Sequence, residues 1–385
     1  THSLVKYSPI KQLTAEQNNL ITEVLENPSK NYLINGDAGT GKTVVATTLF
    51  YYLKTHHKYK SLKIGLVYSN PAMRNVIQQV FAHTPGLRKT DVIAPIDVTK
   101  HHYDIIICDE AQRLRQAKNI GRYIVHFKKG NERLHLDNSH DELDWLLLNA
   151  GRLILFYDPK QIVCPSDISQ TKFDGRLKDR KRGIRPVELK EQMRIHAGSQ
   201  YVPYIYDILF QRNNISKKFV NYDFKLFSSF QDMWNALEEK EATVKLCRFC
   251  SGYGWPWVSK EDSKKPDIQL EGREIWWNRQ TDGWLQNPEA KLEMGSIYSL
   301  AGLDINYAAV IIGPDLIYDI KDQKIKVNRQ NYFDNKVKQG VTDEELTAFL
   351  LKTYAVLMTR GILGTYVYTC DQNLFRYLQR FIPTA

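Results

Sequence analysis

Short apolar runs alternate with amphipathic stretches along the first half of the chain. Strands are predicted at residues 32–35, 63–69, 104–108 and 153–157. Helical stretches such as 72–82 lie between them, while 91–102 reads as a loop with a short strand. The second half resumes this pattern, with strands at 244–249, 308–312 and 365–369 and a helix at 343–358. Such alternation predicts an α/β fold of parallel sheets with helices on both faces.

A basic segment at 176–186, which ends in Arg185-Pro186, reads as an exposed linker between two domains. We therefore expect domains at 1–185 and 186–385, the second with a tryptophan-rich insertion around 225–290. Six of the seven tryptophans lie between Trp234 and Trp284. They are interpreted either as a surface on which bases stack or as a small aromatic core that anchors an irregular insertion.

Residues 36–43 read Gly-Asp-Ala-Gly-Thr-Gly-Lys-Thr, the spacing of a phosphate-binding P-loop after a strand and before a helix. Backbone N–H groups of such a loop hold the phosphate oxygens of ATP. Lys42 adds a charge at the β- and γ-phosphates, and the Thr43 hydroxyl can ligate Mg²⁺. The predicted phosphate-binding residues are Gly36, Ala38, Gly39, Thr40, Gly41, Lys42 and Thr43.

Two carboxylates, Asp109 and Glu110, end the apolar strand predicted at 104–108. The carboxyl ends of parallel strands are where α/β proteins bind ligands. We expect Asp109 to hold Mg²⁺ and Glu110 to orient and deprotonate the attacking water. The alternative is that the pair only begins a helix.

Composition narrows the partners and the compartment. The net charge of +10 indicates a polyanionic partner, nucleic acid first, or else an ordinary basic surface kept for solubility; charge alone does not decide between the two. The five cysteines do not suggest a disulfide scaffold, and Cys247 and Cys250 form one C-x-x-C that reads as strand rather than zinc site. This cysteine usage predicts a protein of the reducing cytoplasm. No apolar run approaches the ~18 residues of a membrane span, so we expect no membrane partner.

On the basis of its sequence motifs, the chain resembles a superfamily 1 helicase. Asp109-Glu-Ala-Gln112 matches the D-E-x-Q box of that group, and Thr14-Ala-Glu-Gln17 matches its upstream glutamine motif. The third to sixth motifs fall at 155–161, 189–194, 299–304 and 354–361. Tyr157 stands where the third motif usually has Gly.

The resemblance implies two tandem RecA-like P-loop NTPase domains with parallel sheets and an ATP site in the cleft between them. It also implies roles for single residues: Gln17 reads adenine, Gln161 senses the γ-phosphate, and Arg194 and Arg360 are arginine fingers. The fifth motif adds nucleotide contacts from Gly302 and Asp304.

Each of these residues has a structural alternative. Thr14 and Gln17 also form a capping box. Gln161 could be a residue of a loop surface, Arg194 an ordinary arginine on a helix face, and Arg360 a cation at a helix end.

The nucleic-acid contacts are predicted by position. Ser69 and Asn70 follow the second strand, where superfamily 1 proteins contact the strand backbone, but they could equally cap the helix that begins near Ala72.

More narrowly, the chain resembles the bacterial Schlafen group 3-like DNA/RNA helicase domain family, on residues 156–159, 252–257, 304–313 and 357–361. Some members carry an N-terminal nuclease domain, which fits a chain that begins at Thr1 without Met. The fifth motif departs from the usual pattern at Tyr298 and Ala301, and the sixth at Ile362-Leu363. These departures concern the coupling of ATP to nucleic acid, not ATP binding.

Together these features predict an ATP-dependent helicase or translocase on single-stranded DNA or RNA. The alternative is an ATPase switch that controls an attached nuclease or partner with little unwinding. A small-molecule kinase shares only the P-loop, and the two separate arginines and the D-E-A-Q box argue against it.

Overall fold

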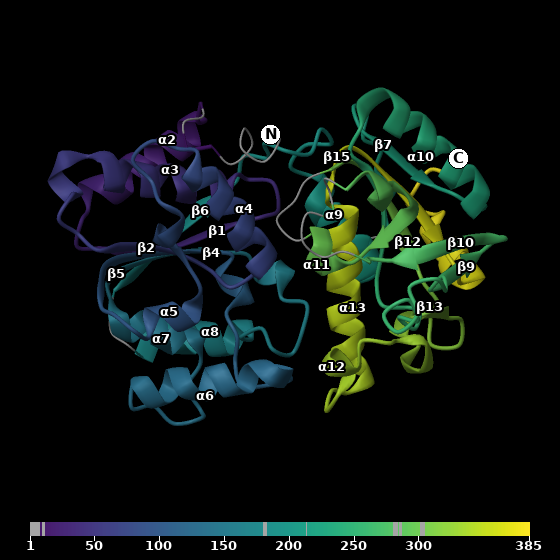
Figure 1. Ribbon diagram of the computed structural model, residues 1–385. Helices are drawn as coiled ribbons and strands as arrows, with labels where there is room; N and C mark the ends of the chain where they lie inside the picture. Colours follow the sequence, from purple (N-terminus) through teal and green to yellow (C-terminus); the bar gives the residue numbers. More distant parts are fainter. Residues whose placement is uncertain are drawn as a thin grey trace. The chain divides into compact units, whose positions relative to one another are not determined.

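The computed structural model describes residues 8–9, 12–179, 183–212, 214–279, 284, 287–300 and 305–385. The chain forms two compact units, Thr1–Gln192 and Met193–Ala385 (Figure 1). Each has its own sheet, and each is described by itself.

The first unit is built on a six-stranded sheet in the order β3-β2-β4-β5-β1-β6, with all neighbours parallel. The strands are β1 Asn31–Gly36, β2 Ile64–Tyr68, β3 Val92–Ile93, β4 Tyr103–Asp109, β5 Ala150–Tyr157 and β6 Ile184–Leu189. The four strands predicted in this half are confirmed. β5 lies between β1, which leads into the P-loop, and β4, which ends in the carboxylate pair.

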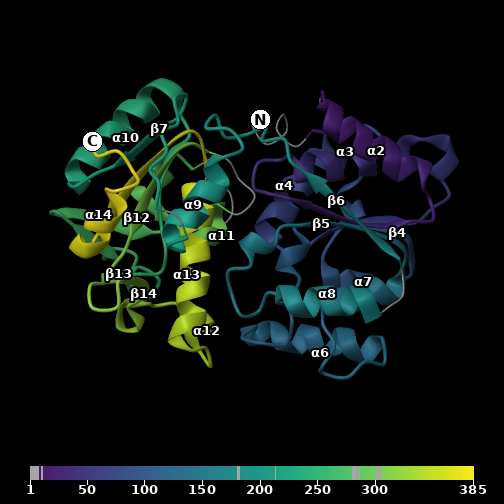
Figure 2. The same ribbon diagram turned by 180° about the vertical axis from the view of Figure 1, so that it is seen from behind.

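Helices cover both faces of this sheet, as the apolar pattern predicted (Figures 1 and 2). Apolar side chains of α2 Ala15–Glu26, α3 Lys42–Thr55 and α4 Pro71–Ala82 form one core with the sheet. Those of α6 Ile124–Arg133, α7 Glu142–Asn149 and α8 Gln170–Asp179 form the other, beside the short α5 Pro95–Val98. In both views α6 is the outermost element on its face.

The predicted linker at 176–186 is largely regular structure. α8 continues to Asp179, residues 180–182 are outside the described residues, and β6 begins at Ile184. Because β6 pairs with β1 over its whole length, it belongs to the first sheet. The boundary between the two units therefore falls after Gln192, later in the chain than the one expected after residue 185.

The second unit has a seven-stranded sheet in the order β7-β15-β12-β8-β11-β10-β9, parallel except for the β9–β10 pair. Its strands are β7 Asp223–Leu226, β8 Cys247–Ser251, β9 Ile268–Leu270, β10 Arg273–Trp277, β11 Glu293–Gly295, β12 Ile305–Ile312 and β15 Gly361–Thr369. A separate hairpin joins β13 Leu316–Asp319 to β14 Lys324–Val327. Cys247 and Cys250 both lie buried in β8, which confirms the strand interpretation of the C-x-x-C.

The helices of this unit are α9 Tyr201–Leu209, α10 Phe230–Val244, α11 Ile297–Leu300, α12 Asn335–Lys338, α13 Asp343–Met358 and α14 Gln372–Leu378. The predicted helix at 343–358 is confirmed as α13, whose first turn is capped by Thr342. α10 packs on one face of the sheet through Phe230, Met233 and Trp234, against Tyr307 and Ile311 of β12. No helix among the described residues is long and apolar enough to cross a membrane.

Candidate nucleotide site and arginine pair

The P-loop connects β1 to α3 through backbone conformations that favour glycine. Gly39 and Gly41 have φ of 91° and 81°, in the left-handed region. A Cβ on Gly36 would lie 2.6 Å from Thr40 Oγ1. The sequence folds this way locally because three glycines let the chain turn tightly before α3 begins, which leaves the helix N-terminus open toward an anion.

Lys42 is buried, and its ammonium group lies inside the loop. Lys42 Nζ donates to the carbonyl oxygens of Gly36 at 2.5 Å and Asp37 at 3.0 Å. It also lies 3.8 Å from Asp158 Oδ2. The lysine is thus held by groups that a bound phosphate can replace as its partners.

Asp109, the last residue of β4, is completely buried. Burial and the neighbouring Glu110 raise the pKa of this carboxyl from 3.8 to about 6, although the nearby hydroxyls of Thr43 and Tyr68 lower it. Oδ1 accepts the Glu110 N–H at 3.0 Å, while the buried Oδ2 has no hydrogen bond of normal geometry from any described residue. A buried carboxylate oxygen beside a threonine hydroxyl is a donor set that suits Mg²⁺.

Glu110 has a strained backbone, with φ 54° and ψ 42° in the left-handed region. For a residue other than glycine this conformation costs about 1–3 kcal/mol and is most often found at functional sites. The Glu110 carboxylate accepts Gln112 Nε2 at 2.8 Å. The completely buried Gln112 in turn accepts the Asp158 N–H at its Oε1, at 3.1 Å.

Asp158 joins these groups to the residues that follow β5. Its Oδ2 accepts Gln161 Nε2 at 2.7 Å and faces Lys42. Burial raises the pKa of Asp158, and Lys42 and Gln161 lower it. Neither Asp158 nor Gln112 has a role predicted from the sequence, although both lie inside the helicase-like motifs. The structure shows that they connect Glu110 to Lys42 and Gln161.

Gln17 lies against the P-loop. The predicted capping box is confirmed, because Thr14 and Gln17 exchange hydrogen bonds of 3.2 Å at the start of α2. Gln17 Nε2 also donates to Thr40 O at 3.2 Å, and a Cβ on Gly41 would collide with this amide. The contact of Gln17 with adenine stays a prediction.

The two candidate arginine fingers lie together in the second unit. Arg360 follows Thr359, the C-cap of α13, and is buried just before β15. Arg194 Nη2 donates to the Thr359 carbonyl oxygen at 2.8 Å. Tyr201 fixes the same helix end by donating its hydroxyl to Met358 O at 3.0 Å. Gly302 and Asp304 of the fifth motif lie outside the described residues.

The predicted nucleic-acid contacts both have structural partners. Ser69 is buried, and its hydroxyl donates to Glu142 Oε2 at 3.3 Å. Asn70 is the N-cap of α4 and accepts the Ala72 N–H at 3.0 Å. The cap that we weighed as the alternative is therefore present, and a role in binding nucleic acid stays a prediction for both residues.

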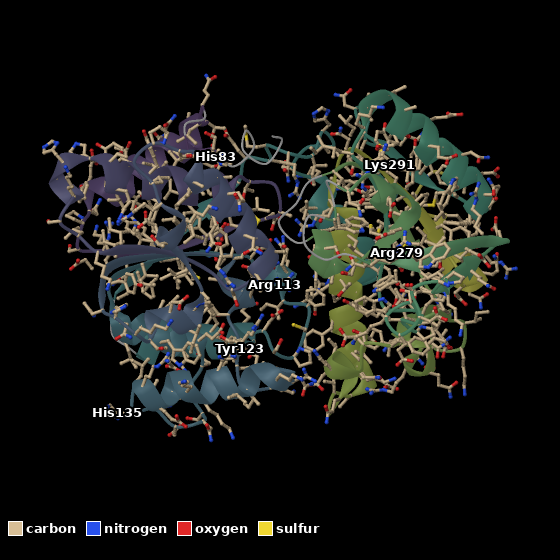
Figure 3. The ribbon with its side chains drawn as sticks, in the orientation of Figure 1. His83, Arg113, Tyr123, His135, Arg279 and Lys291 are labelled. Atoms are coloured by element: carbon tan, nitrogen blue, oxygen red, sulfur yellow. The ribbon has the colours of Figure 1, made fainter. Side chains whose placement is uncertain are left out.

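Glu142 connects Ser69 to a basic region that sequence reasoning missed. It accepts the Arg115 N–H and the Tyr123 hydroxyl, each at 2.8 Å, and burial raises its pKa while Arg115 lowers it. The Arg115 guanidinium lies 4.6 Å from the centroid of the Tyr123 ring. Figure 3 labels Tyr123 in the first unit.

The segment 118–129 around Tyr123 carries exposed cations, which we call the basic face. Its members are Lys118, Arg122, Lys128 and Lys129. None of the four makes an ion pair with a residue that the structure describes. A run of seven basic residues against one acid at 113–133 was the available signal, since the opposite stripe of α6 is buried through Phe127.

Comparison with known proteins finds one matching family and several more distant relatives. The family described as Schlafen group 3, DNA/RNA helicase domain, matches residues 29–371. An uncharacterized protein of Saccharomyces cerevisiae is 26% identical over 99% of this chain and 93% of its own length. A structure of Pif1 helicase from Candida albicans is 11% identical with a TM-score of 0.38, covering 93% of this chain and 95% of its own. A structure of two Pif1 helicases at forked DNA is 13% identical with a TM-score of 0.34, covering 97% and 95%.

Proposed function

The chain belongs to the Schlafen group 3 DNA/RNA helicase domain family, and from this premise we propose that it hydrolyses ATP with Mg²⁺ to move along single-stranded DNA or RNA. Membership makes it an ATP hydrolase of the helicase and translocase class. The observation that carries the nucleotide chemistry is the hydrogen-bonded chain from Glu110 through Gln112 and Asp158 to Gln161, beside Lys42.

The P-loop would hold the triphosphate through its N–H groups and Lys42. Lys42 would exchange the carbonyl oxygens of Gly36 and Asp37 for phosphate oxygens, a better partner for an ammonium group. Asp109 and Thr43 would hold Mg²⁺, since no described residue gives the buried Asp109 Oδ2 a hydrogen bond of normal geometry. The ion supplies positive charge to the β- and γ-phosphates.

Glu110 would orient and deprotonate the attacking water. Gln112 holds one Glu110 oxygen, so the carboxylate direction depends on Asp158, whose N–H fixes Gln112. Gln161 would sense the γ-phosphate through the same Asp158. Loss of the γ-phosphate would then also affect Glu110, the proposed base.

Arg360 and Arg194 of the second unit would complete the charge stabilisation as arginine fingers. Such a finger is worth ~10³–10⁵ in rate. Gln17, Gly302 and Asp304 complete the proposed nucleotide contacts. The five free cysteines suit the reducing cytoplasm in which we place the protein.

The basic face would bind the phosphate backbone of nucleic acid, next to Ser69 and Asn70. Changing Arg122, Lys128 and Lys129 together to Gln tests this. For a single strand the slope of log affinity against log salt changes by about 0.7 for each phosphate that a cation neutralises, so the triple variant should have a slope flatter by about 2.

A matched control removes the same charge elsewhere in the first unit, from the exposed Lys58, Lys60 and Lys89. This control should keep the wild-type salt slope. An equal flattening in both triple variants would mean that only net charge matters and that the basic face is not a contact surface.

The function as a whole is tested by the ATPase rate with and without single-stranded DNA and RNA, beside a strand-displacement assay. We expect stimulation by at least one polymer and loss of turnover in Lys42→Ala. Stimulation without displacement would identify a translocase or a switch. No stimulation by either polymer would overturn the proposal.

A further inference from the structure

The tryptophan-rich segment has no part in the nucleotide chemistry, and the structure divides its members into two groups. Trp234, Trp277 and Trp284 are buried. Trp234 stacks on Phe249 at 4.6 Å, and Trp284 Nε1 donates to Glu293 at 3.0 Å. The aromatic-core interpretation therefore accounts for these three, and also for the half-buried Trp255, which packs against the core of the second unit.

Trp257 and Trp276 are different, because neither is part of the core. The Trp257 side chain is 40% exposed, and Trp276 is half-buried. Trp257 Nε1 donates to Ser259 Oγ at 3.1 Å, and Trp276 Nε1 donates to Ser263 O at 3.2 Å. Both indole edges are thus anchored in one loop.

Each of the two rings has a cation beside it. Lys260 Nζ lies 5.7 Å from the Trp257 ring centroid, and the Arg279 guanidinium lies 5.2 Å from that of Trp276. These distances are within the ~6 Å range of cation–π attraction. The buried Glu293 orients Arg279 by accepting its Nε at 2.9 Å. Figure 3 labels Arg279 in the second unit.

A buried carboxylate fixes the loop to the sheet. Asp267 accepts the Ser259 N–H at 2.7 Å and the Trp277 N–H at 2.6 Å. The loop that carries Trp257 is therefore tied to β10, the strand that carries Trp276. Both rings are held in place before any ligand arrives, which reduces the entropy that binding must overcome.

We propose that Trp257 and Trp276, with Lys260 and Arg279, form a site for unpaired bases of single-stranded nucleic acid. The rings would stack on bases, and the cations would lie near phosphates. Charge supports this occupant, because the exposed Lys260 and Lys264 make no ion pair with any described residue. The inference rests on the proposed function and assigns its polymer a contact in the second unit.

The test measures binding of fluorescent oligo(dT) and oligo(rU) to the full chain by anisotropy, with Trp257→Ala and Trp276→Ala. Stacking is worth ~1–3 kcal/mol per base, so each variant should bind roughly 5- to 150-fold more weakly. Phe at either position should restore most of the affinity. Val258→Ala, an exposed change in the same loop, is the matched control and should bind like wild type.

The salt dependence of binding, and a comparison of duplex with single strands, distinguish base stacking from attraction between charges. The Trp variants should keep the wild-type salt slope, whereas Lys260→Gln should flatten it by about 0.7. A fully paired duplex should bind wild type and both Trp variants alike. If the Trp substitutions weakened binding to the duplex as much as binding to single strands, the assignment of base stacking would be overturned.

The outcomes distinguish this inference from the proposed function. Wild type that binds neither polymer would defeat the proposed function itself. Wild type that binds, beside Trp variants that bind equally well, would overturn only the stacking site. If Trp276→Ala fails to fold by circular dichroism, the exposed Trp257→Ala decides alone. The ratio of dT to rU affinity shows which sugar the site prefers.

Discussion

Replacing Asp109 by Asn should stabilise the protein while removing the proposed ligand of Mg²⁺. Burial raises the pKa of Asp109 from 3.8 to about 6, so ionising it costs more in the folded than in the unfolded chain. Above pH 6 this cost is about 3 kcal/mol, at 1.36 kcal/mol for each pH unit. For a unit of this size that corresponds to roughly 6–12 °C in Tm.

The pH dependence of stability gives the direction of the change expected in Asp109→Asn. Between pH 4 and 6 the folded wild-type protein keeps a proton that the unfolded chain loses, so its stability falls as the pH rises. The advantage of Asp109→Asn should therefore be about 3 kcal/mol at pH 7.5 and below about 1 kcal/mol near pH 4. The Asn can keep the acceptor for the Glu110 N–H and offer its amide to Thr43 and Tyr68.

Thermal unfolding in EDTA at the two pH values measures this difference. Glu132→Gln removes the same charge from an exposed position on α6 and should change stability by no more than about 0.5 kcal/mol. Adding Mg²⁺ should raise the Tm of wild type but not of Asp109→Asn. An Asn variant that is no more stable than wild type at pH 7.5 would refute the reasoning.

Substitutions at three further positions test the nucleotide site. Glu110→Gln should bind ATP but lose about 10²–10⁴ in turnover, and a near wild-type rate would remove the base assignment. Arg360→Ala should lose ~10³–10⁵ in turnover with little change in nucleotide affinity, and Arg360→Lys should not restore it; unchanged turnover would make Arg360 structural. Gly41→Ala should cost about 1–3 kcal/mol and weaken ATP binding in calorimetry, because of its φ of 81° and the Gln17 amide. Gly175→Ala lies within the helix α8 and meets open space, so it should stabilise the protein by about 0.5–1 kcal/mol. Equal losses in both glycine variants would contradict the P-loop argument.

Local signals predicted much of the fold. The helix at 343–358 was predicted residue for residue, because an acidic first turn marks its start and apolar residues continue along its length. The strand predicted at 244–249 begins only at Cys247, since α10 continues to Val244. Lys245 and Leu246 then turn the chain with φ of 60° and 52°, which an apolar run does not reveal.

Some residues of the candidate site could be predicted from local sequence, and others could not. The P-loop and Asp109-Glu110 could be predicted because each lies within a few residues of sequence. The burial of Ser69 could not, because its partner Glu142 is 73 residues further along. The role of Asp158 likewise depends on Gln112 and Lys42, which only the order of β1, β5 and β4 brings within reach.

The bond from Arg194 to the main chain at Thr359 has an evolutionary consequence. Every amino acid presents a carbonyl there, so mutational drift at position 359 cannot by itself remove this hydrogen bond. Drift at 194 can, and no single second-site replacement at 359 would compensate. This contact therefore depends on the side chain at residue 194 alone.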